Sequence, residues 1–205
     1  YVNNDFGVNL VKEFTAPYTA LGGTVVSVTP YNAKQSSYAA EVTNALKADA
    51  PALYFIGYPG DGTTIVRTWI QQGGPQKFLL NDGMNAADFV KGVGPQFLAS
   101  AFGTSSGTTK TPSTEFFASA YPAMSGGFDA GAPAADRAFD AGAILGLAIA
   151  HAGKFEAAAI RDAIRKVTDP AGEVVHAGPQ GFAKALQLIK DKKPLRYVGV
   201  IGPAS

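Results

Sequence analysis

A carboxylate follows an apolar run at a point where it could bind a cation. Residues 78–80, Phe-Leu-Leu, lead directly into Asn81, Asp82 and Gly83. An ionised aspartate accepts charge-assisted hydrogen bonds, which are strong, and an ammonium group is a matching donor. Asp82 fits equally well as part of an Asx turn that leads to Asn85 as a helix cap. The residues alone favour neither interpretation.

Two aromatic residues stand in comparable positions. Tyr58 follows the apolar run 52–57, just as Asp82 follows 78–80. If both runs are strands of one parallel sheet, their carboxyl ends share one edge, where open α/β sheets bind ligands. A tyrosine at that edge covers an apolar group with its ring and offers its hydroxyl group. Phe6 would join the same edge if a strand precedes it.

Two other motifs match known chemistry less well. Residues 103–107 fit the nucleophile pattern G-x-S-x-G with Ser105 in its centre, and His176, in a predicted loop, would be its base. That pattern needs a helix to start at once, whereas Thr, Lys, Pro and Ser follow here, so a flexible linker is the better interpretation. The Gly-rich run 57–62 lacks the Lys-Ser or Lys-Thr of a phosphate loop, and Asp61 is predicted to lie at a turn or helix start.

Composition argues against several classes of function. Charged residues make up only 16% of the chain, the net charge is +1, and no basic stripe is present, so no nucleic-acid partner is expected. Cysteine is absent, which removes disulfides, thiolate metal sites and cysteine nucleophiles. With only His151 and His176 as imidazoles, we expect no metal and no cofactor. No apolar run reaches the length of a membrane span, and the opening YVNNDFG lacks a signal-peptide pattern.

Strands and helices alternate through the first half of the chain. Helical apolar spacing predicts helices after Phe6, after Ser37 as an N-cap, around residues 65–70, and after Asn85 as a cap. Strands are predicted between them at 24–28, 52–57, 77–80 and 98–104. This alternation predicts an α/β fold over residues 1–105, with a parallel sheet and right-handed crossovers.

The second half has a different texture. A Gly-, Ser- and Thr-rich stretch predicts a hinge or crossing over residues 106–112. Residues 113–194 are predicted to be mainly helical. Residues 195–205 are predicted to form a strand and the start of a further crossing.

Five segments, in order, resemble one family. They are NNDFGVNLVKEF…LGGTVV, DAPALYFIGYPGDGTTIVRTWIQQGG, FLLNDGMNAADFVKGVG, RAFDAGAILGLAIAHAG and GPQGFAKALQLIKDKKPLRYVGVIGP. Together they resemble the type I periplasmic substrate-binding proteins of branched-chain amino-acid (Leu/Ile/Val) ABC transporters. The resemblance covers nearly the whole chain. It implies two α/β lobes joined by three crossings, with a small ligand held between them.

The resemblance also implies roles for three residues. Asp82 stands where the amino-acid-binding members place an acidic residue, often Glu, that binds the ligand's ammonium group. Tyr58 falls in a segment that supplies an aromatic contact. Phe6 matches an aromatic position that is often Tyr, so it keeps the stacking surface and loses the hydroxyl group.

The family pattern further implies that this chain is partial. Residues 1–105 resemble the second, ligand-binding lobe, and residues 113–194 resemble helices that return to the first lobe. The first lobe, or a complementary chain fragment, would then be a partner, together with a membrane permease. The implied protein is a periplasmic or membrane-associated extracellular binding protein and not an enzyme. Alternatives are a sensor of the same fold for an amide, urea or aromatic acid, and, less favoured, a hydrolase-like enzyme using Ser105.

Overall fold

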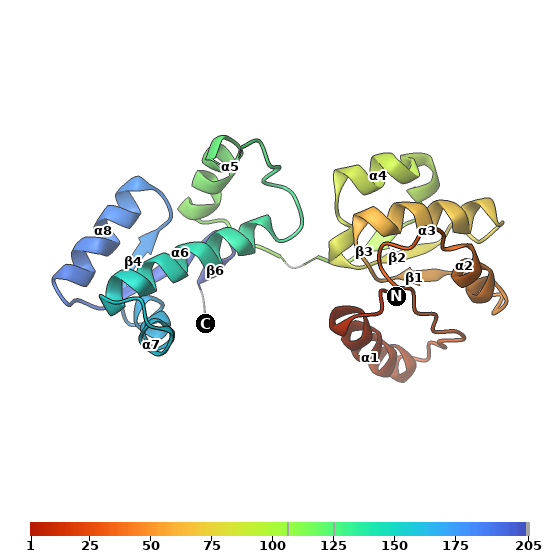
Figure 1. Cartoon of the computed structure of the whole chain (residues 1–205), viewed down its shortest axis with the longest axis horizontal. Coiled ribbons are helices and arrows are strands. Elements are labelled where there is room, and N and C mark those ends of the chain that lie inside the picture. The colour runs from red at the N-terminus through yellow and green to blue at the C-terminus, as the bar shows by residue number, and fades with distance from the viewer. Residues whose placement is uncertain (106, 125, 204–205) are drawn as a thin grey trace. The chain divides into compact units, whose positions relative to one another are not determined.

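The computed structural model describes residues 1–105, 107–124 and 126–203 (Figure 1). The chain divides into two compact units, Tyr1–Ser106 and Gly107–Ser205, and each has its own cluster of buried apolar side chains. The predicted hinge at 106–112 and the predicted domain limits stay predictions. Part of the predicted hinge falls on Ser106, and part of the last predicted domain falls on residues 204 and 205. These three residues lie outside the described residues.

The first unit alternates helices with short strands. Its elements are α1 (Asp5–Ala20), α2 (Ala39–Leu46), β1 (Leu53–Phe55), α3 (Pro59–Gln71), β2 (Phe78–Leu80), the 3₁₀ helix η1 (Asp82–Met84), α4 (Ala87–Val93), the 3₁₀ helix η2 (Pro95–Leu98) and β3 (Phe102–Gly103). β1, β2 and β3 pair in that order and are parallel, which confirms the predicted α/β class.

Residues near the N-terminus extend this sheet beyond β1. The Val2 amide donates to the Ile56 carbonyl at 2.9 Å, and Val2 forms a parallel bridge with Tyr31 on its other side. The order across the sheet is therefore Tyr31, Val2, β1, β2, β3. After Val2 the chain adds Tyr31 on one side of it and then β1, β2 and β3 in turn on the other side. The topological switch point, where the strand order reverses, therefore lies between Val2 and β1.

Helices cover the two faces of this sheet unequally. Figure 1 shows α1 on the side of the sheet opposite α3 and α4. The α3–α4 face carries the core, in which Phe55, Phe78 and Trp69 are buried. On the α1 face, Phe14 packs on Tyr54 with ring centroids 4.5 Å apart. Neighbouring strand residues alternate between faces, and strand register places two exposed side chains on the same face as Tyr54: Leu79 (38% exposed) and Phe102 (70%).

The second unit is mainly helical, with a small mixed sheet. Its elements are α5 (Pro112–Met124), α6 (Ala135–Ala152), α7 (Ala157–Val167), β4 (Glu173–His176), α8 (Pro179–Lys190), β5 (Leu195–Gly199) and β6 (Gly202–Pro203). β4 and β5 are parallel, and β5 and β6 are antiparallel. Within the described residues no single helix has both the length and the apolar composition of a membrane span; α6 and α7 reach them only as a pair bent by 110°.

A buried carboxylate organises the turn between β5 and β6. Asp140, from α6, accepts hydrogen bonds from the Tyr197 hydroxyl group at 2.9 Å and from the Val200 and Ile201 amides at 2.9 and 3.0 Å. A buried charge needs such partners, since each unpaired polar group in a core is destabilising. Burial and the nearby charge of Asp140 both raise the pKa of Tyr197.

Five sequence predictions were wrong in whole or in part. Residues 24–28 form no regular strand, although their neighbour Tyr31 bridges to Val2. His176 ends strand β4 and does not lie in a loop. The N-caps are Tyr38 and Ala86, one residue after the predicted Ser37 and Asn85, and neither of these two side chains caps its helix. The Ser37 hydroxyl group does accept a hydrogen bond from the Ala39 amide, the first of α2, at 3.3 Å. Of the predicted strand 98–104 only β3 is a strand, and the first of these residues, Leu98, ends η2.

Candidate ligand-binding site

Two aromatic rings meet at the switch point of the first unit. Phe6 and Tyr58 stack with ring centroids 5.6 Å apart and an interplanar angle of 28°. Phe6 lies in the first turn of α1, just after Val2, and Tyr58 is the N-cap of α3, just after β1. Tyr58 is 44% exposed, so the stacked pair presents an aromatic surface to solvent. The sequence prediction that these two residues share one edge is consistent with this geometry.

The start of α1 is fixed by local chemistry. The Asn4 side chain accepts a hydrogen bond from the Gly7 amide at 2.9 Å, which satisfies one of the free N–H groups of the first turn. Gly7 is required because any Cβ there would collide with the Val2 carbonyl group. The close approach of Gly7 to Val2 holds Phe6 at the sheet edge.

An asparagine joins the loop after β1 to the loop after β2. The Asn81 side chain is buried (3% exposed); its oxygen accepts from the Gly57 amide at 2.9 Å, and its nitrogen donates to the Gly57 carbonyl at 3.2 Å. Gly57 precedes Tyr58, and Asn81 precedes Asp82. The two bonds therefore fix the spacing between these two candidate residues. Sequence analysis assigned no role to Asn81, and its place at the end of a strand was the one available signal.

Asp82 is exposed and starts η1. Its Oδ1 accepts from the Gly83 amide at 2.9 Å and lies 3.4 Å from the Asn81 side-chain nitrogen. Among the described residues none forms a hydrogen bond with Oδ2. The carboxylate thus shapes its own turn, and its second oxygen stays available to an outside donor. Both interpretations left open by the sequence are compatible with this arrangement.

Asp82 lies on the same side as the aromatic residues. A side chain at Gly83, the next residue, would lie 3.7 Å from the Tyr58 ring. Burial raises the pKa of Tyr54, and the negative charge of Asp82 raises it further. The charge of Asp82 therefore reaches Tyr54 on the α1 face of the sheet, and the residue after Asp82 lies beside the Tyr58 ring.

Asp61 has a different, internal role. It accepts hydrogen bonds from the Tyr38 hydroxyl group at 2.6 Å and from the Lys34 amide at 3.1 Å. Burial and this bond raise the pKa of Tyr38. Asp61 thus ties the loop before α2 to the first turn of α3, a structural function that the Gly-rich run 57–62 did not reveal.

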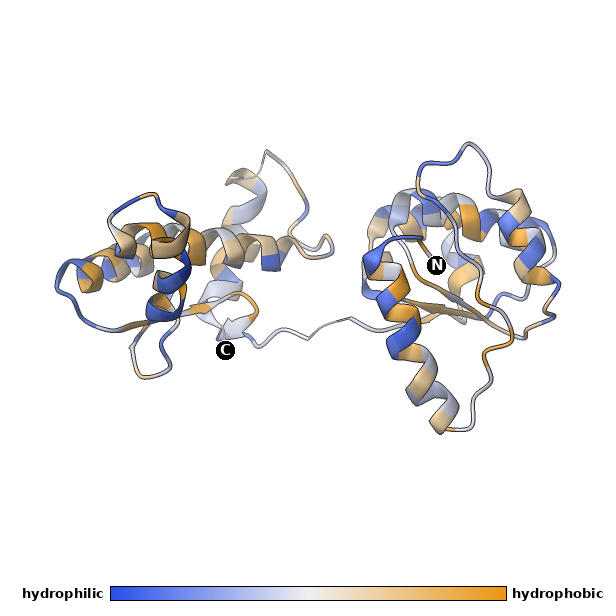
Figure 2. Ribbon diagram, turned by 60° about the horizontal axis from the view of Figure 1, so that its bottom comes forward, coloured by the Kyte–Doolittle hydropathy of each residue, from blue (hydrophilic) through white to orange (hydrophobic). Residues whose placement is uncertain are grey.

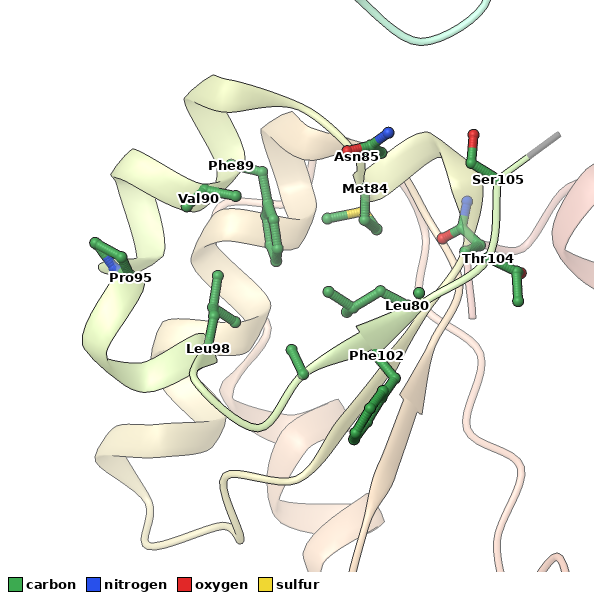
Figure 3. A pocket seen from close by; sticks show the side chains of 13 residues that line it. Leu80, Met84, Asn85, Phe89, Val90, Pro95, Leu98, Phe102, Thr104 and Ser105 are labelled. Atoms are coloured by element: carbon green, nitrogen blue, oxygen red, sulfur yellow. The ribbon is translucent and has the colours of Figure 1, made fainter. Parts of the chain in front are cut away.

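A separate cavity of about 490 Å³ lies between α4 and strands β2 and β3 (Figure 3). Leu80, Phe89 and Leu98 point into it, and Asn85 and Ser105 stand at its rim. The first helix after Ser105 in the described part of the chain is α5, which begins at Pro112. The strand–turn–helix geometry of a nucleophile elbow is therefore not formed around this serine.

The arrangement can hold a small cationic or amphipathic solute. Two stacked rings, an exposed carboxylate and a buried amide that spaces them converge at the carboxyl edge of a parallel sheet, where such folds bind ligands. In the described residues, no group of three or more His, Asp or Glu side chains is placed to hold a metal ion.

Comparison with known families decides the affiliation. The sequence profile of the periplasmic binding protein family matches residues 1–191. The chain belongs to this family. Family and fold neighbours are binding proteins, which supports a solute-binding role for the chain. None of the curated proteins searched matches the chain.

Solved structures agree on the type I fold. The leucine binding protein LivK of Thermotoga maritima is 25% identical, with a TM-score of 0.66, over 82% of this chain and 47% of its own. A type 1 periplasmic binding protein of Bordetella pertussis is 24% identical, with a TM-score of 0.66, over 82% of this chain and 49% of its own. LivJ of Streptococcus pneumoniae, solved in complex with isoleucine, is 20% identical, with a TM-score of 0.61, over 82% of this chain and 48% of its own. The chain thus spans about half the length of these proteins.

Proposed function

We propose that the chain is part of the extracytoplasmic solute-binding component of an ABC transporter, and that it binds a branched-chain or related amino acid. The family match supports the class of protein. The names of similar structures, a leucine binding protein and a transporter protein in complex with isoleucine, support the ligand class. The partner that accepts the loaded protein would be a membrane permease.

Each of the three site residues has a proposed contact. Asp82 accepts hydrogen bonds from the ligand's ammonium group through its unpaired oxygen. Tyr58 and Phe6 form an aromatic wall against the ligand's apolar part, and the Tyr58 hydroxyl group adds a polar contact. The observation that carries this assignment is the stacked Phe6–Tyr58 pair beside the Asp82 turn, held in place by Asn81.

The other half of the contacts belongs to a second lobe. In a two-lobe binding protein the ligand stabilises the closed form by its differential affinity for closed and open states. A ligand carboxylate would not bind beside Asp82, since like charges at close range repel. The ligand carboxylate therefore requires hydrogen-bond donors from the partner lobe. The 205-residue chain alone is therefore expected to bind leucine more weakly than micromolar.

Calorimetric titration of the full-length protein with leucine, isoleucine and valine tests the assignment. Asp82→Asn should weaken binding at least about 30-fold, equivalent to about 2 kcal/mol, because it removes one partner of a desolvated charge pair. Asp88→Asn is the matched control, since Asp88 is an exposed aspartate in the first turn of α4. Tyr58→Phe should keep the stacking contact, and Tyr58→Ala should lose it.

Two results would overturn the proposal. One is equal affinity of the Asp82→Asn and Asp88→Asn variants for leucine. The other is a ligand without an amino group, identified by mass spectrometry after the full-length protein is denatured; an amide, urea or aromatic acid would favour a sensor of the same fold. Esterase activity of the unmodified protein that disappears in a Ser105→Ala variant would instead favour the hydrolase alternative.

A further inference from the structure

The turn after β2 contains a dipeptide whose backbone can attack its own side chain. β2 consists of apolar residues, in keeping with the orange strands of the first unit in Figure 2, and the chain becomes hydrophilic at Asn81 and Asp82. Gly83 follows, and glycine offers the least hindered backbone nitrogen because it has no side chain beside that atom. The chain has one other Asp-Gly pair, Asp61–Gly62, and no Asn-Gly pair.

Local geometry holds the reacting groups of Asp82 and Gly83 together. The Gly83 amide donates to Asp82 Oδ1 at 2.9 Å, so the nitrogen lies against the carboxyl group that it would attack. Groups held in contact react faster than groups that must first meet. Asp82 is exposed, so water reaches its carboxyl group.

The other Asp-Gly pair is held in the opposite way. Asp61 lies in the first turn of α3, and the Gly62 amide donates to the Tyr58 carbonyl at 2.9 Å as part of that helix. The Asp61 carboxylate accepts from the Tyr38 hydroxyl group and the Lys34 amide. The nitrogen and the carboxyl group of this pair thus have different partners, and the helix must open before they can react.

Packing requires the glycine that makes the first pair reactive. A Cβ on residue 83 would lie 2.8 Å from the Asn81 side-chain nitrogen and 2.9 Å from the Gly57 carbonyl oxygen, closer than real Cβ contacts. These two groups form one of the hydrogen bonds that join the loops after β1 and β2. A larger residue after Asp82 would push them apart. The turn therefore keeps glycine beside an exposed carboxylate.

We propose that Asp82 isomerises to isoaspartate through a succinimide formed with Gly83. The Gly83 nitrogen bonds to Cγ of Asp82 and gives up its proton, and one carboxyl oxygen leaves as water. Water then opens the ring at either carbonyl group, which restores aspartate or leaves isoaspartate. One water is released and one is consumed, so the reaction needs no oxidant, reductant or cofactor.

Isomerisation would displace the carboxylate that the proposed function assigns to the ligand. In isoaspartate the backbone runs through the former side chain, which adds one methylene group to the turn and leaves the carboxylate on Cα. This effect on binding rests on the proposed function, whereas the reaction itself does not. A bound ammonium group favours the ionised carboxylate, which does not release water. Ligand should therefore slow the reaction.

Mass spectrometry of aged protein tests the inference. The full-length protein is kept in mildly acidic heavy-oxygen water, with and without leucine, and is then digested with trypsin in ordinary water. Trypsin places the two Asp-Gly pairs in separate peptides, 48–67 and 78–91. Without leucine, heavy oxygen and isoaspartate should appear at Asp82 at least about tenfold faster than at Asp61.

Asp82→Glu is the matched variant. Glutamate keeps a carboxylate at this position, but attack by the Gly83 nitrogen would need a larger and less favoured ring. Asp82→Asn is unsuitable, because an Asn-Gly pair closes the same ring with loss of ammonia. In Asp82→Glu, heavy oxygen should be absent from residue 82 and unchanged at Asp61. Affinity for leucine should fall with isoaspartate content in the unmodified protein, and should not change on ageing in the variant.

The outcomes separate this inference from the proposed function. Equal rates at Asp61 and Asp82, or no isoaspartate at Asp82, would overturn the inference and leave the proposed function intact. Isoaspartate at Asp82 with undiminished affinity, and at the same rate with leucine present, would support the reaction and remove Asp82 from the proposed site. An equal loss of affinity in aged Asp82→Glu would overturn the link between isomerisation and binding.

Discussion

Removing the Asn81 side chain should destabilise the first unit strongly. Asn81→Ala leaves the Gly57 amide and carbonyl groups without their side-chain partner, and both bonds are buried. Each buried group left unsatisfied is destabilising by about 1–3 kcal/mol. For two such groups we therefore expect the free energy of unfolding to fall by about 2–6 kcal/mol. Water that enters the small space left by the side chain would bring the loss toward the lower value.

Tryptophan fluorescence during urea unfolding provides a specific assay. Trp69 is the only tryptophan of the chain and is 3% exposed in the core of the first unit. Its emission therefore reports the first unit alone. Asn85→Ala is the matched control, because Asn85 is exposed and its amide bonds through the backbone to Asp82. The control should change stability by less than about 0.5 kcal/mol.

The same variant should also weaken ligand binding by the full-length protein, because Tyr58 and Asp82 would no longer be held at a fixed spacing. An Asn81→Ala variant with a urea midpoint and slope like those of the control would refute the idea that Asn81 couples the two loops. A change in stability without any change in affinity would leave Asn81 as a core residue and remove its positioning role.

Three further predictions concern ionisable groups. Asp82→Asn should lower the pKa of Tyr54, measured by NMR titration of the ring, because a negative neighbour is removed; burial will still keep it above the ordinary value. Asp140→Ala should destabilise the second unit by about 3 kcal/mol or more, measured by circular dichroism, because the Tyr197 hydroxyl group and two amides lose their acceptor. With a free Tyr1 amino group, whose pKa is 8.0 unfolded and about 6 folded, the native state binds fewer protons between these values. Stability should therefore rise by about 2 kcal/mol from pH 6 to pH 8, and acetylation of that group should abolish the rise.

The sequence predicted those elements whose signal is local. β2 and the Asp82 turn were found because an apolar run ends abruptly in polar residues, and α3 was found from its apolar spacing. β4 was missed because only Val174 and Val175 mark it between a charged residue and His176. Its pairing with β5, some twenty residues later, supplies the stability that its own residues do not.

The candidate site was predicted as a set of positions but not as a geometry. Topology alone placed Phe6, Tyr58 and Asp82 at one edge. The bonds between Asn81 and Gly57 join residues 24 positions apart, and no local pattern specifies such a contact. The stacking of Phe6 on Tyr58 likewise depends on how the first turn of α1 and the residue before α3 meet at the edge of the sheet, which sequence spacing does not describe.

The failed strand at 24–28 has a cause that links it to the site. β-propensity measures fit to a pleated surface with neighbours, so a β-branched run without a partner strand has no ladder to join. Pairing stops at Thr29, where the Tyr1 amino group makes the last rung. The residues that end this ladder also set the start of α1, because Val2 pairs with Ile56 and contacts Gly7. The absence of a strand at 24–28 and the position of Phe6 therefore depend on the same short ladder, which ends at Thr29.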